Sequence, residues 1–500
     1  MPIRRLFVLA LLAASTHARD LANCTRQRLC NGDYLCADVC KLGTVVPDAF
    51  ASRGLALQRA LTYNDRLARH TLIGSHNSAI SLAYGFGIEM DGFETLLNKT
   101  LYDNDDLGEG VDSSFTLKDQ LNMGLRHLEI DITAGYFELP WPKPNDFFVC
   151  HSPVPLSPQQ VAAVEAAALR QGVHLGKWNP AKLSCLETRV PLRTAFLEVK
   201  TWLDAHPEEV VVLFLDTKPL TMVERAQANA MSALIRDVFN ESVWSARDGD
   251  RDTLLNTTHA ELIARGKRLY IEDHEDAYNK ADDPIVFASA IWSHQFGASD
   301  LSAFPACTIS GDADWYTNVA GTARPFARGL YDDGSTLHDG GATHDALRAN
   351  ATRCGVNVVS PNYVQPRDMA AFVWTWDAGE PAAAAMGADD EACVVQNANG
   401  RWAAVDCDKA RAMPLACRKA DDDKTWTLQK PSSSSSVAAV VACGAGWLAR
   451  APTNGYANGL LRVAAAAAGL GAASVMLNVS TDGRAGSPAM ASRRPQIVEA

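Results

Sequence analysis

The sequence lacks the features that mark membrane-spanning and nucleic-acid-binding proteins. After the first 18 residues it has no apolar run long enough to span a bilayer, because Leu460–Val475 is rich in Ala and Gly and is followed by polar sequence. Basic residues are in deficit, with 46 Lys and Arg against 58 Asp and Glu and a net charge of −12. This balance excludes the basic footprint of a nucleic-acid partner and broad adhesion to anionic membranes, although a local patch can still reach a lipid substrate.

Residues 1–18 predict a secretory signal peptide. Arg4 and Arg5 form the charged start, and Leu6–Ala14 forms the apolar core. Thr16 and Ala18 place small residues at the −3 and −1 positions of a cleavage site after Ala18. We therefore expect a secreted, extracellular protein, and six sequons predict that it is a glycoprotein. The sequons are at Asn23, Asn98, Asn240, Asn256, Asn350 and Asn478.

The 12 cysteines, an even number, agree with an oxidising compartment. Four of them lie close together near the N-terminus: Cys24, Cys30, Cys36 and Cys40. Such a cluster predicts disulfides, and a zinc site is the alternative. The close C-x-x-C pairs of zinc sites are missing and no His lies nearby, so we favour disulfides.

From about residue 70 to 375, short apolar strands alternate with longer helical stretches, which is typical of an α/β fold. The strand candidates are Thr71–Gly74, Arg126–Ile132, Phe147–Cys150, Val210–Leu215, Arg268–Ile271, Ile285–Ala288 and Val356–Val359. The helical candidates include Pro158–Gln171, Pro191–Ala205 and Val223–Phe239. Continuously apolar strands belong to a sheet that is buried on both faces, so we expect a TIM-type barrel or a doubly wound sheet.

Polar residues follow the candidate strands at the end where α/β folds gather their functional groups. They are Ser75-His76-Asn77, Glu129 and Asp131, His151-Ser152, Asp216-Thr217-Lys218, and Glu272-Asp273-His274. Glu129 and Asp131 are two residues apart, which puts both carboxylates on one face of a strand. We interpret His127 as a core or surface residue on the opposite face. The pattern predicts a site made of imidazole, amide and carboxylate groups.

The ordered motifs S-H-N, R-x-x-E-x-D, C-H-S and L-x-L-D-x-K, together with Leu203–Val211, resemble a known family. They are similar to the catalytic X region of phosphatidylinositol-specific phospholipase C, in its branch of small secreted or bacterial-type proteins. The resemblance covers roughly residues 60–375. It implies a distorted TIM barrel and a phosphodiesterase that acts on phospholipid at a membrane surface. The PH, EF-hand and C2 modules of the larger eukaryotic members have no counterpart in the sequence.

The same resemblance implies a catalytic pair of histidines. His76 is the expected general base, taking the proton of the inositol 2-hydroxyl, and His151 is the expected general acid for the departing diacylglycerol oxygen. The ordinary pKa of a His side chain, about 6.5, suits both roles near neutrality. Attack of the hydroxyl on its neighbouring phosphate gains from proximity and gives a cyclic phosphodiester.

Members of the family either use Ca²⁺ or place an Arg where the ion would sit. This chain has Asp131 at that position, two residues past Glu129. An amide and three carboxylates are therefore the implied ligands, and such hard oxygen donors suit Ca²⁺. The set is Asn77, Glu129, Asp131 and Asp216. Without a cation, three converging carboxylates would repel one another, so we expect a calcium cofactor.

Three further residues are candidates for binding substrate. Lys218 can pair with the phosphate as a point charge. Arg126 is either a structural ion-pair partner or a second phosphate contact, and Tyr363 can stack on a sugar ring. His274 and Trp292 either line the pocket or pack in the core.

Residues 374–418 resemble the second half of a C-type lectin domain. The matching residues are Trp376, Gly379-Glu380-Pro381, Cys393, Gly400-Arg401-Trp402, Cys407 and Ala416-Cys417-Arg418. This resemblance implies a Cys393–Cys407 disulfide and a possible glycan contact through the C-terminal segment. The alternative is a disulfide-braced appendage that only closes the barrel.

We expect five segments along the chain. They are a signal peptide at 1–18, a Cys-rich lead-in at 19–60, the catalytic domain at 61–375, the lectin-like segment at 376–420 and an Ala/Gly/Ser-rich region at 421–500. Two functions remain open: a Ca²⁺-dependent phosphodiesterase acting on inositol phospholipids or glycosylphosphatidylinositol, and a secreted carbohydrate- or surface-binding protein on an inactive barrel. The complete His pair and four oxygen ligands favour the first.

Overall fold

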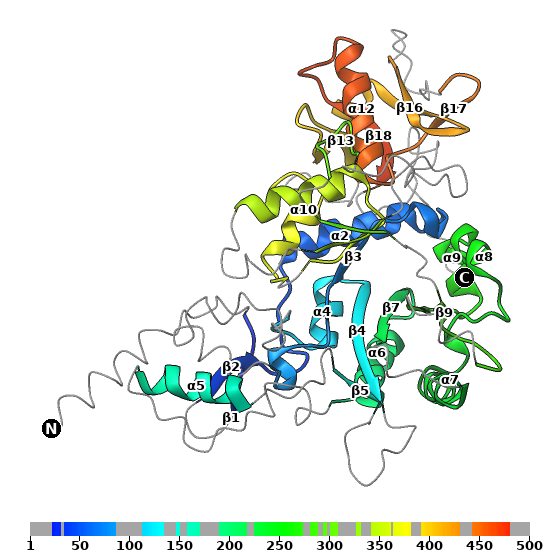
Figure 1. The fold of residues 1–500 in the computed structure, drawn as a ribbon. Coiled ribbons are helices and arrows are strands. Elements are labelled where there is room, and N and C mark those ends of the chain that lie inside the picture. Colours follow the sequence, from blue (N-terminus) through cyan, green and yellow to red (C-terminus); the bar gives the residue numbers. More distant parts are fainter. Residues whose placement is uncertain are drawn as a thin grey trace.

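The computed structural model describes residues 23–31, 35–86, 113–134, 147–150, 158–170, 190–217, 225–273, 281–288, 294–297, 301–308, 327–331, 342–361, 364–381, 392–430 and 443–480. A parallel sheet with flanking helices occupies the middle of the chain, and a C-terminal module stands at one end of it (Figure 1). Within these ranges, no helix combines the length and apolar character that crossing a membrane requires.

Six parallel strands form the centre of the main sheet, in the order β12-β3-β4-β7-β8-β9. Their bounds are β3 Leu72–Ser75, β4 His127–Ala134, β7 Val211–Thr217, β8 Leu269–Asp273, β9 Phe287–Ala288 and β12 Val358–Val359. Two short strands, β5 (Phe147–Val149) and β6 (Val190–Pro191), extend the sheet from β4 in antiparallel fashion. Strand β7 is buried along almost its whole length, as its continuous apolar sequence predicts.

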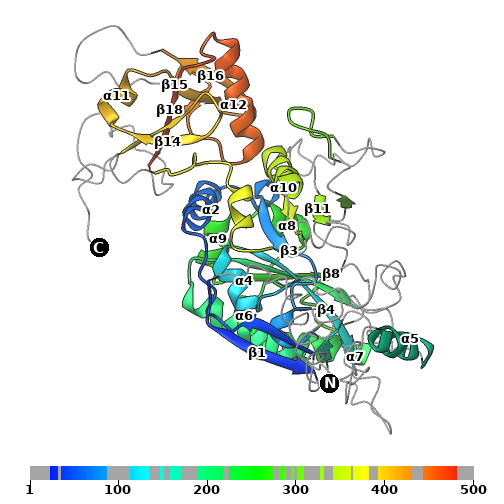
Figure 2. The ribbon, with the colours of Figure 1, turned by 90° about the vertical axis from the view of Figure 1, so that its left-hand side faces the viewer.

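Helices flank this sheet (Figure 2). The α-helices of this part are α2 Ala49–Thr62, α4 Leu117–Met123, α5 Pro158–Arg170, α6 Leu192–Ala205, α7 Arg225–Phe239, α8 Arg251–Asn256, α9 His259–Ala264 and α10 Ala342–Cys354. Short 3-10 helices are η1 Leu67–Arg69, η2 Leu82–Tyr84, η5 Asn240–Ser242 and η10 Asp368–Phe372. Helix α6 buries Phe196, Val199 and Leu203, whose spacing of three and four residues makes one apolar stripe against α4 and α7.

The mixed α/β architecture is confirmed, and each of the ten strands and helices named from the sequence begins and ends within two residues of its prediction. The predicted TIM barrel is found only in part. Among the described residues the hydrogen-bonded strand order ends at β9 and β12 and does not close. Strands β10 (His294–Gly297) and β11 (Ala327–Tyr331) form a separate parallel pair, with β11 beside β12.

The N-terminal part is a hairpin of β1 (Arg26–Asn31) and β2 (Leu35–Cys40), followed by helix α2. Cys24 and Cys40 form a disulfide, which consumes both thiols and decides the choice between disulfides and zinc for this pair. Helix α2 runs through position 60, where we expected the lead-in to end. Its Asp48 cap accepts a hydrogen bond from the N–H of Ala51 at 2.7 Å, so the helix begins where its sequence allows.

Residues 392–430 and 443–480 form the C-terminal module, built on one six-stranded sheet. Its elements are β13 Cys393–Gln396, β14 Trp402–Val405, α11 Cys407–Arg411, β15 Leu415–Lys419, β16 Asp422–Gln429, β17 Trp447–Ala449, α12 Gly455–Ala467 and β18 Val475–Ser480. Strands β15 and β16 pair across position 420, so the sheet spans both predicted C-terminal segments. The implied Cys393–Cys407 disulfide is confirmed, and a second bridge joins Cys417 to Cys443. The lectin resemblance and the glycan contact stay predictions.

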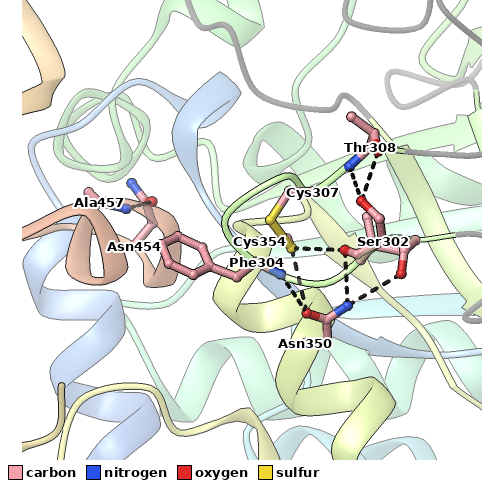
Figure 3. The surroundings of a disulfide bond; sticks show 9 residues. Ser302, Phe304, Cys307, Thr308, Asn350, Cys354, Asn454 and Ala457 are labelled. Atoms are coloured by element: carbon pink, nitrogen blue, oxygen red, sulfur yellow. Dashed lines mark hydrogen bonds between the residues drawn. A yellow bond between two sulfur atoms is a disulfide. The ribbon is translucent and has the colours of Figure 1, made fainter. Parts of the chain in front are cut away.

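The module is fixed to the rest of the protein through close packing (Figure 3). The Cys307–Cys354 disulfide ties residues 301–308 to the end of α10. Phe304, in the same segment, meets the ring of Tyr456 of α12 edge-on at 5.7 Å. A side chain at Gly459 would meet the Phe304 ring at 2.5 Å, so this contact requires glycine.

Asn350 of α10 holds the same segment. Its amide accepts a hydrogen bond from the N–H of Phe304 at 3.3 Å and donates to the carbonyl of Ser302 at 3.3 Å (Figure 3). A glycan at this sequon would be attached to the side-chain nitrogen of Asn350. In the fold, this nitrogen already donates a hydrogen bond.

Candidate active site

The carboxyl ends of the parallel strands bring the predicted acids together. Asp131 of β4 and Asp216 of β7 are register partners. Glu129 is the partner of Phe214, which is in turn the partner of Glu272 of β8. Register partners in a parallel sheet share a face, so Glu129, Asp131, Asp216 and Glu272 all project from one face of the sheet near its carboxyl edge.

Ser78 attaches the loop that follows β3 to this edge. Its N–H donates to the carbonyl of Glu129 at 2.8 Å, and its hydroxyl accepts from the N–H of Glu129 at 2.9 Å. The side-chain amide of Gln120, on α4, donates to the Ser78 carbonyl at 2.8 Å. Ser78 is completely buried. These bonds fix the preceding residues, His76 and Asn77, beside strand β4.

His76 and Asn77 form the turn at the end of β3. The His76 N–H donates to the carbonyl of Pro361 at 3.4 Å, which links this turn to the segment after β12. Asn77 is 5% exposed and has φ of 44°, a left-handed conformation that Asn tolerates better than most residues. His76 is half-buried. The turn therefore carries a half-buried imidazole next to a buried amide.

Burial separates the acids into a deep and an accessible group. Glu129 is 2% exposed and Asp131 is 0% exposed, whereas Asp216 is half-buried like His76. The N–H of Cys150 donates to the carbonyl of Asp131 at 3.0 Å, so the end of β5 lies against the end of β4. Cys150 is disulfide-bonded.

A buried pair, His127 and Glu272, lies on the same face, with His127 at the start of β4. The Nε2 atom of His127 lies 3.2 Å from Oε1 of Glu272, and its Nδ1 atom lies 3.3 Å from the hydroxyl of Ser360. Our placement of His127 opposite Glu129 is wrong, because residues two apart on a strand share a face. Glu272 belongs to a strand-end cluster that the sequence showed, but we gave it no role.

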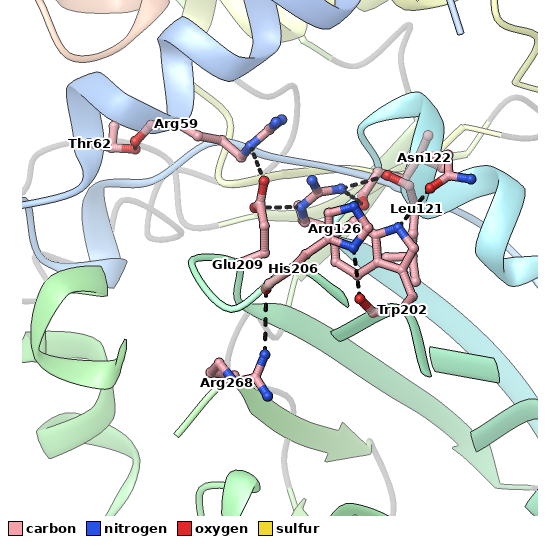
Figure 4. A network of polar contacts seen from close by, with 10 residues as sticks. Arg59, Thr62, Leu121, Asn122, Arg126, Trp202, His206, Glu209 and Arg268 are labelled. Carbon is pink, nitrogen blue, oxygen red and sulfur yellow. Dashed lines mark hydrogen bonds and ion pairs between the residues drawn. The ribbon is translucent and has the colours of Figure 1, made fainter. Parts of the chain in front are cut away.

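Arg126 belongs to a different network of polar contacts, which Figure 4 shows. It precedes β4, about 16 Å along the strand from Asp131. Its Nε donates to Glu209 at 2.9 Å and its Nη1 to the carbonyls of Leu121 and Leu125. The structural ion pair, one of our two interpretations of Arg126, is confirmed, and its guanidinium is engaged at the opposite end of the sheet from His76.

Arg59 of α2 shares the same carboxylate, with Nε 3.4 Å from Oε1 of Glu209 (Figure 4). Burial alone would raise the pKa of Glu209, but the guanidinium groups of Arg126 and Arg59 outweigh burial and lower this pKa to about 2. Glu209 therefore stays ionised between two cations.

Three predicted site residues lie outside the described residues: His151, Lys218 and Tyr363. His274 and Trp292 lie outside them as well. Their roles stay predictions. Each of the first three follows a described anchor within two residues, namely Cys150, Thr217 and Pro361.

The donor chemistry of the carboxyl edge fits a hard cation. Asn77, Glu129, Asp131 and Asp216 offer only oxygen ligands, and Glu129 and Asp131 are deeply buried carboxylates on one strand face. Within the described residues, no three acidic, His or Cys side chains form a metal cluster by themselves. A cation at this edge would therefore depend on the Asn77 amide and on ligands from substrate or water.

No family model matches the chain. Over 320 residues it is 28% identical to an uncharacterized protein of Mycobacterium tuberculosis, found in two strains. The aligned part covers 59% of this chain and 61% of the relative, so the chain spans about three fifths of the length of the curated relatives it matches.

Similar solved structures are bacterial phosphatidylinositol-specific phospholipases C. A calcium-dependent enzyme from Pseudomonas sp. is 14% identical, covers 63% of this chain and 95% of its own, and has a TM-score of 0.33. The Listeria monocytogenes enzyme is 12% identical, with 64% and 97% coverage and a TM-score of 0.35. A double mutant of the S. aureus enzyme is 11% identical, with 65% and 98% coverage and a TM-score of 0.32. These TM-scores are too low to establish a common fold, so function has to be argued from the residues of the site.

Proposed function

We propose that this protein is a secreted phosphodiesterase of the phospholipase C type, which cleaves inositol phospholipids or glycosylphosphatidylinositol with two histidines and Ca²⁺. The observation that carries the proposal is the carboxyl edge of the sheet. There a half-buried His76 follows β3, and Ser78, two residues on, bonds its turn to β4, the strand of Glu129 and Asp131. Strand ends that gather one general base and several oxygen ligands are suited to hydrolytic chemistry.

His76 takes the proton from the inositol 2-hydroxyl, and that oxygen then forms a bond to the neighbouring phosphorus. The bond between phosphorus and the diacylglycerol oxygen breaks, and His151 gives the leaving oxygen its proton. The products are a cyclic inositol phosphate and diacylglycerol. Ser78 supports this role of His76, because it fixes the His76 turn against β4 through both its backbone and its hydroxyl. The family resemblance implies that His151 is the acid, and His151 follows Cys150, whose N–H donates to the carbonyl of Asp131.

Asn77, Glu129, Asp131 and Asp216 are the residues that would hold Ca²⁺. When bound, the ion supplies positive charge that lowers the pKa of the attacking hydroxyl and offsets charge on the phosphoryl oxygens. The position of Glu129 and Asp131 supports a cation, since both project carboxylate oxygens from one strand face and such hard donors suit Ca²⁺. Lys218 pairs with the phosphate and Tyr363 with the inositol ring in this proposal.

The test uses the purified full chain with vesicles of phosphatidylinositol, and separately with a glycosylphosphatidylinositol-anchored protein. Cyclic inositol phosphate and diacylglycerol are measured with Ca²⁺, with EDTA, and with Ca²⁺ restored. His76→Ala is expected to lower the rate by about 10²–10⁴-fold, the usual contribution of a general base.

His206→Gln is the matched control, because His206 lies at the amino end of the strands beside Trp202. It should leave the rate within about twofold of wild type, as removal of a remote group does. Absence of product from every substrate would overturn the proposed phosphodiesterase activity and favour the carbohydrate- or surface-binding alternative. Full activity in EDTA would overturn the assignment of Ca²⁺ as cofactor and would leave the assignment of the two histidines unchanged.

A further inference from the structure

A small cavity of about 40 Å³ lies at the amino ends of the strands, at the other end of the sheet from the candidate active site. Helix α2, the starts of β3 and β4, and His259 at the start of α9 line it, and Thr453 of the C-terminal module reaches it. Two guanidinium groups, those of Arg59 and Arg126, contribute to its wall. Of the described residues that line the cavity, none is acidic.

Two buried polar atoms that line this cavity have no hydrogen-bond partner in the described structure. They are the Nε2 atom of His259 and the hydroxyl oxygen of Thr71. His259 is 7% exposed, so its Nε2 cannot be satisfied by bulk water. A buried polar atom without a partner is costly, by about 1–3 kcal/mol in proteins. Both atoms therefore indicate that the cavity holds a polar occupant.

The protonation of His259 is linked to the charge of the occupant. Its Nε2 has no hydrogen-bond partner in the described structure. The protonated ring carries an N–H at Nε2 and a positive charge, whereas the neutral ring carries a proton on only one of its two nitrogens. An anion in the cavity would therefore favour the protonated ring.

Without an anion in the cavity, the surroundings of His259 oppose the protonation of its ring. Burial, together with the charges of His70 and Arg59, lowers the pKa of His259 to about 4, and Glu209 opposes this shift in part. An anion beside the ring would raise that pKa again. The groups that face His259 are Arg59, Tyr63, His70, Glu208 and Glu209.

We propose that this cavity binds one small tetrahedral oxyanion, of the size and charge of sulfate or hydrogen phosphate, between Arg59, Arg126 and protonated His259. The cavity has room for about three waters, since about 10–15 Å³ holds one, so a small occupant can take their place. The Glu209 carboxylate neutralises one of the two guanidinium groups, and the second is left for the anion. The proposal is independent of the phosphodiesterase activity, since it concerns the opposite end of the sheet.

Sulfate is the probe of choice, because its charge does not change above pH 3 or so and any pH dependence then belongs to the protein. Binding to the full chain is measured by calorimetry and thermal unfolding between about pH 5 and 7, against sodium chloride at the same ionic strength. Sulfate should raise the unfolding temperature where chloride does not. Its affinity should weaken about tenfold for each pH unit above the pKa of His259.

Arg59→Gln should weaken sulfate binding at least tenfold, and His259→Gln should remove its pH dependence. Arg53→Gln is the matched control, since Arg53 is an exposed Arg on the same helix. Arg59→Lys keeps the charge and should retain part of the affinity if Arg59→Gln fails to fold. In wild type, the imidazole ¹⁵N signals of His259, identified by their loss in His259→Gln, should move with sulfate. Unmoved signals, equal effects of chloride and sulfate, or equal binding by Arg59→Gln and Arg53→Gln would show an adventitious ion only and overturn the proposal.

Discussion

The two ends of the parallel sheet carry different kinds of charged side chain, although the same strands supply both. Strand β4 shows the contrast within one segment, since Arg126 precedes it and Asp131 lies near its far end. At the amino end, Arg126 meets Glu209 in a buried ion pair. At the carboxyl end, Glu129 and Asp131 are buried on one face beside further acids.

The difference separates stability from chemistry. At the amino end, Arg126 and Glu209 form a buried ion pair, so breaking it should lower the free energy of unfolding. The carboxyl end gathers acidic side chains on one face of the sheet, an arrangement that suits a cation or a reacting group instead. Substitutions at the two ends should therefore change different measurements, and the experiments below are ordered by the size of the expected effect.

Arg126→Met should give the largest effect, a loss of about 3–5 kcal/mol in the free energy of unfolding, because it leaves the carboxylate of Glu209 buried with one cation fewer. Denaturant unfolding followed by circular dichroism measures this loss. Arg193→Met is the control, since its pair with Asp237 is exposed and should be worth less than about 1 kcal/mol. Equal losses in both variants would contradict the amino end as a source of stability.

His259→Gln should flatten the pH dependence of stability at the amino end. The folded-state pKa of His259, about 4, lies below its ordinary value of 6.5, so the unfolded chain binds the proton first. Wild-type stability should fall by roughly 3 kcal/mol as the pH drops from 6.5 to 4, and level off below that window. The variant should lack this fall in urea unfolding measured across the same range. An unchanged pH profile would show that another group controls it.

Asp131→Asn should act on the opposite end, lowering the rate of cyclic product formation by roughly 100-fold, the scale of one lost electrostatic contact. The free energy of unfolding in EDTA should stay unchanged or rise slightly, because one buried negative charge is removed from an acidic face. Asp204→Asn, at an exposed acid, is the control for both measurements. Added Ca²⁺ should raise the free energy of unfolding of the wild type more than that of Asp131→Asn. An equal increase in both proteins would show that Asp131 is not a ligand of the cation.

The elements of the sheet could be predicted from the sequence because their signals are local. Strand β7 is a continuous apolar run, and α6 carries an apolar stripe, so both were located within two residues. The extent of the C-terminal sheet was not predicted, because β18 is joined to β13 and β15 only through long-range pairing. Polar, Ser-rich sequence between these strands gave no sign that they share one sheet.

The residues of the candidate site likewise divide into those that local sequence predicts and those that depend on long-range contacts. His76, Asn77, Glu129, Asp131 and Asp216 follow apolar strands, and that position alone predicted that they gather at one edge. The position of Glu272 on the face of Glu129 could not be predicted, because it depends on the register of β4, β7 and β8, which the sequence does not contain. The assignment of Arg126 required its partner Glu209, more than eighty residues away.

Ser78→Ala should give the smallest effect. It tests whether a structural contact at the carboxyl end changes kcat as well as the free energy of unfolding. Ser78 touches no substrate in our proposal, and its hydroxyl bonds the N–H of Glu129 and the carbonyl of Ser75. Loss of these bonds should cost about 1 kcal/mol in the free energy of unfolding, the usual worth of a buried hydrogen bond. Because the turn that carries His76 loosens, kcat should fall by roughly tenfold, as small misplacement of a reacting group predicts. Ser242→Ala, at the far end of the sheet, should cost similar stability and leave kcat unchanged. A loss of stability at Ser78 with wild-type kcat would make Ser78 a structural residue and confine the chemistry to the charged groups.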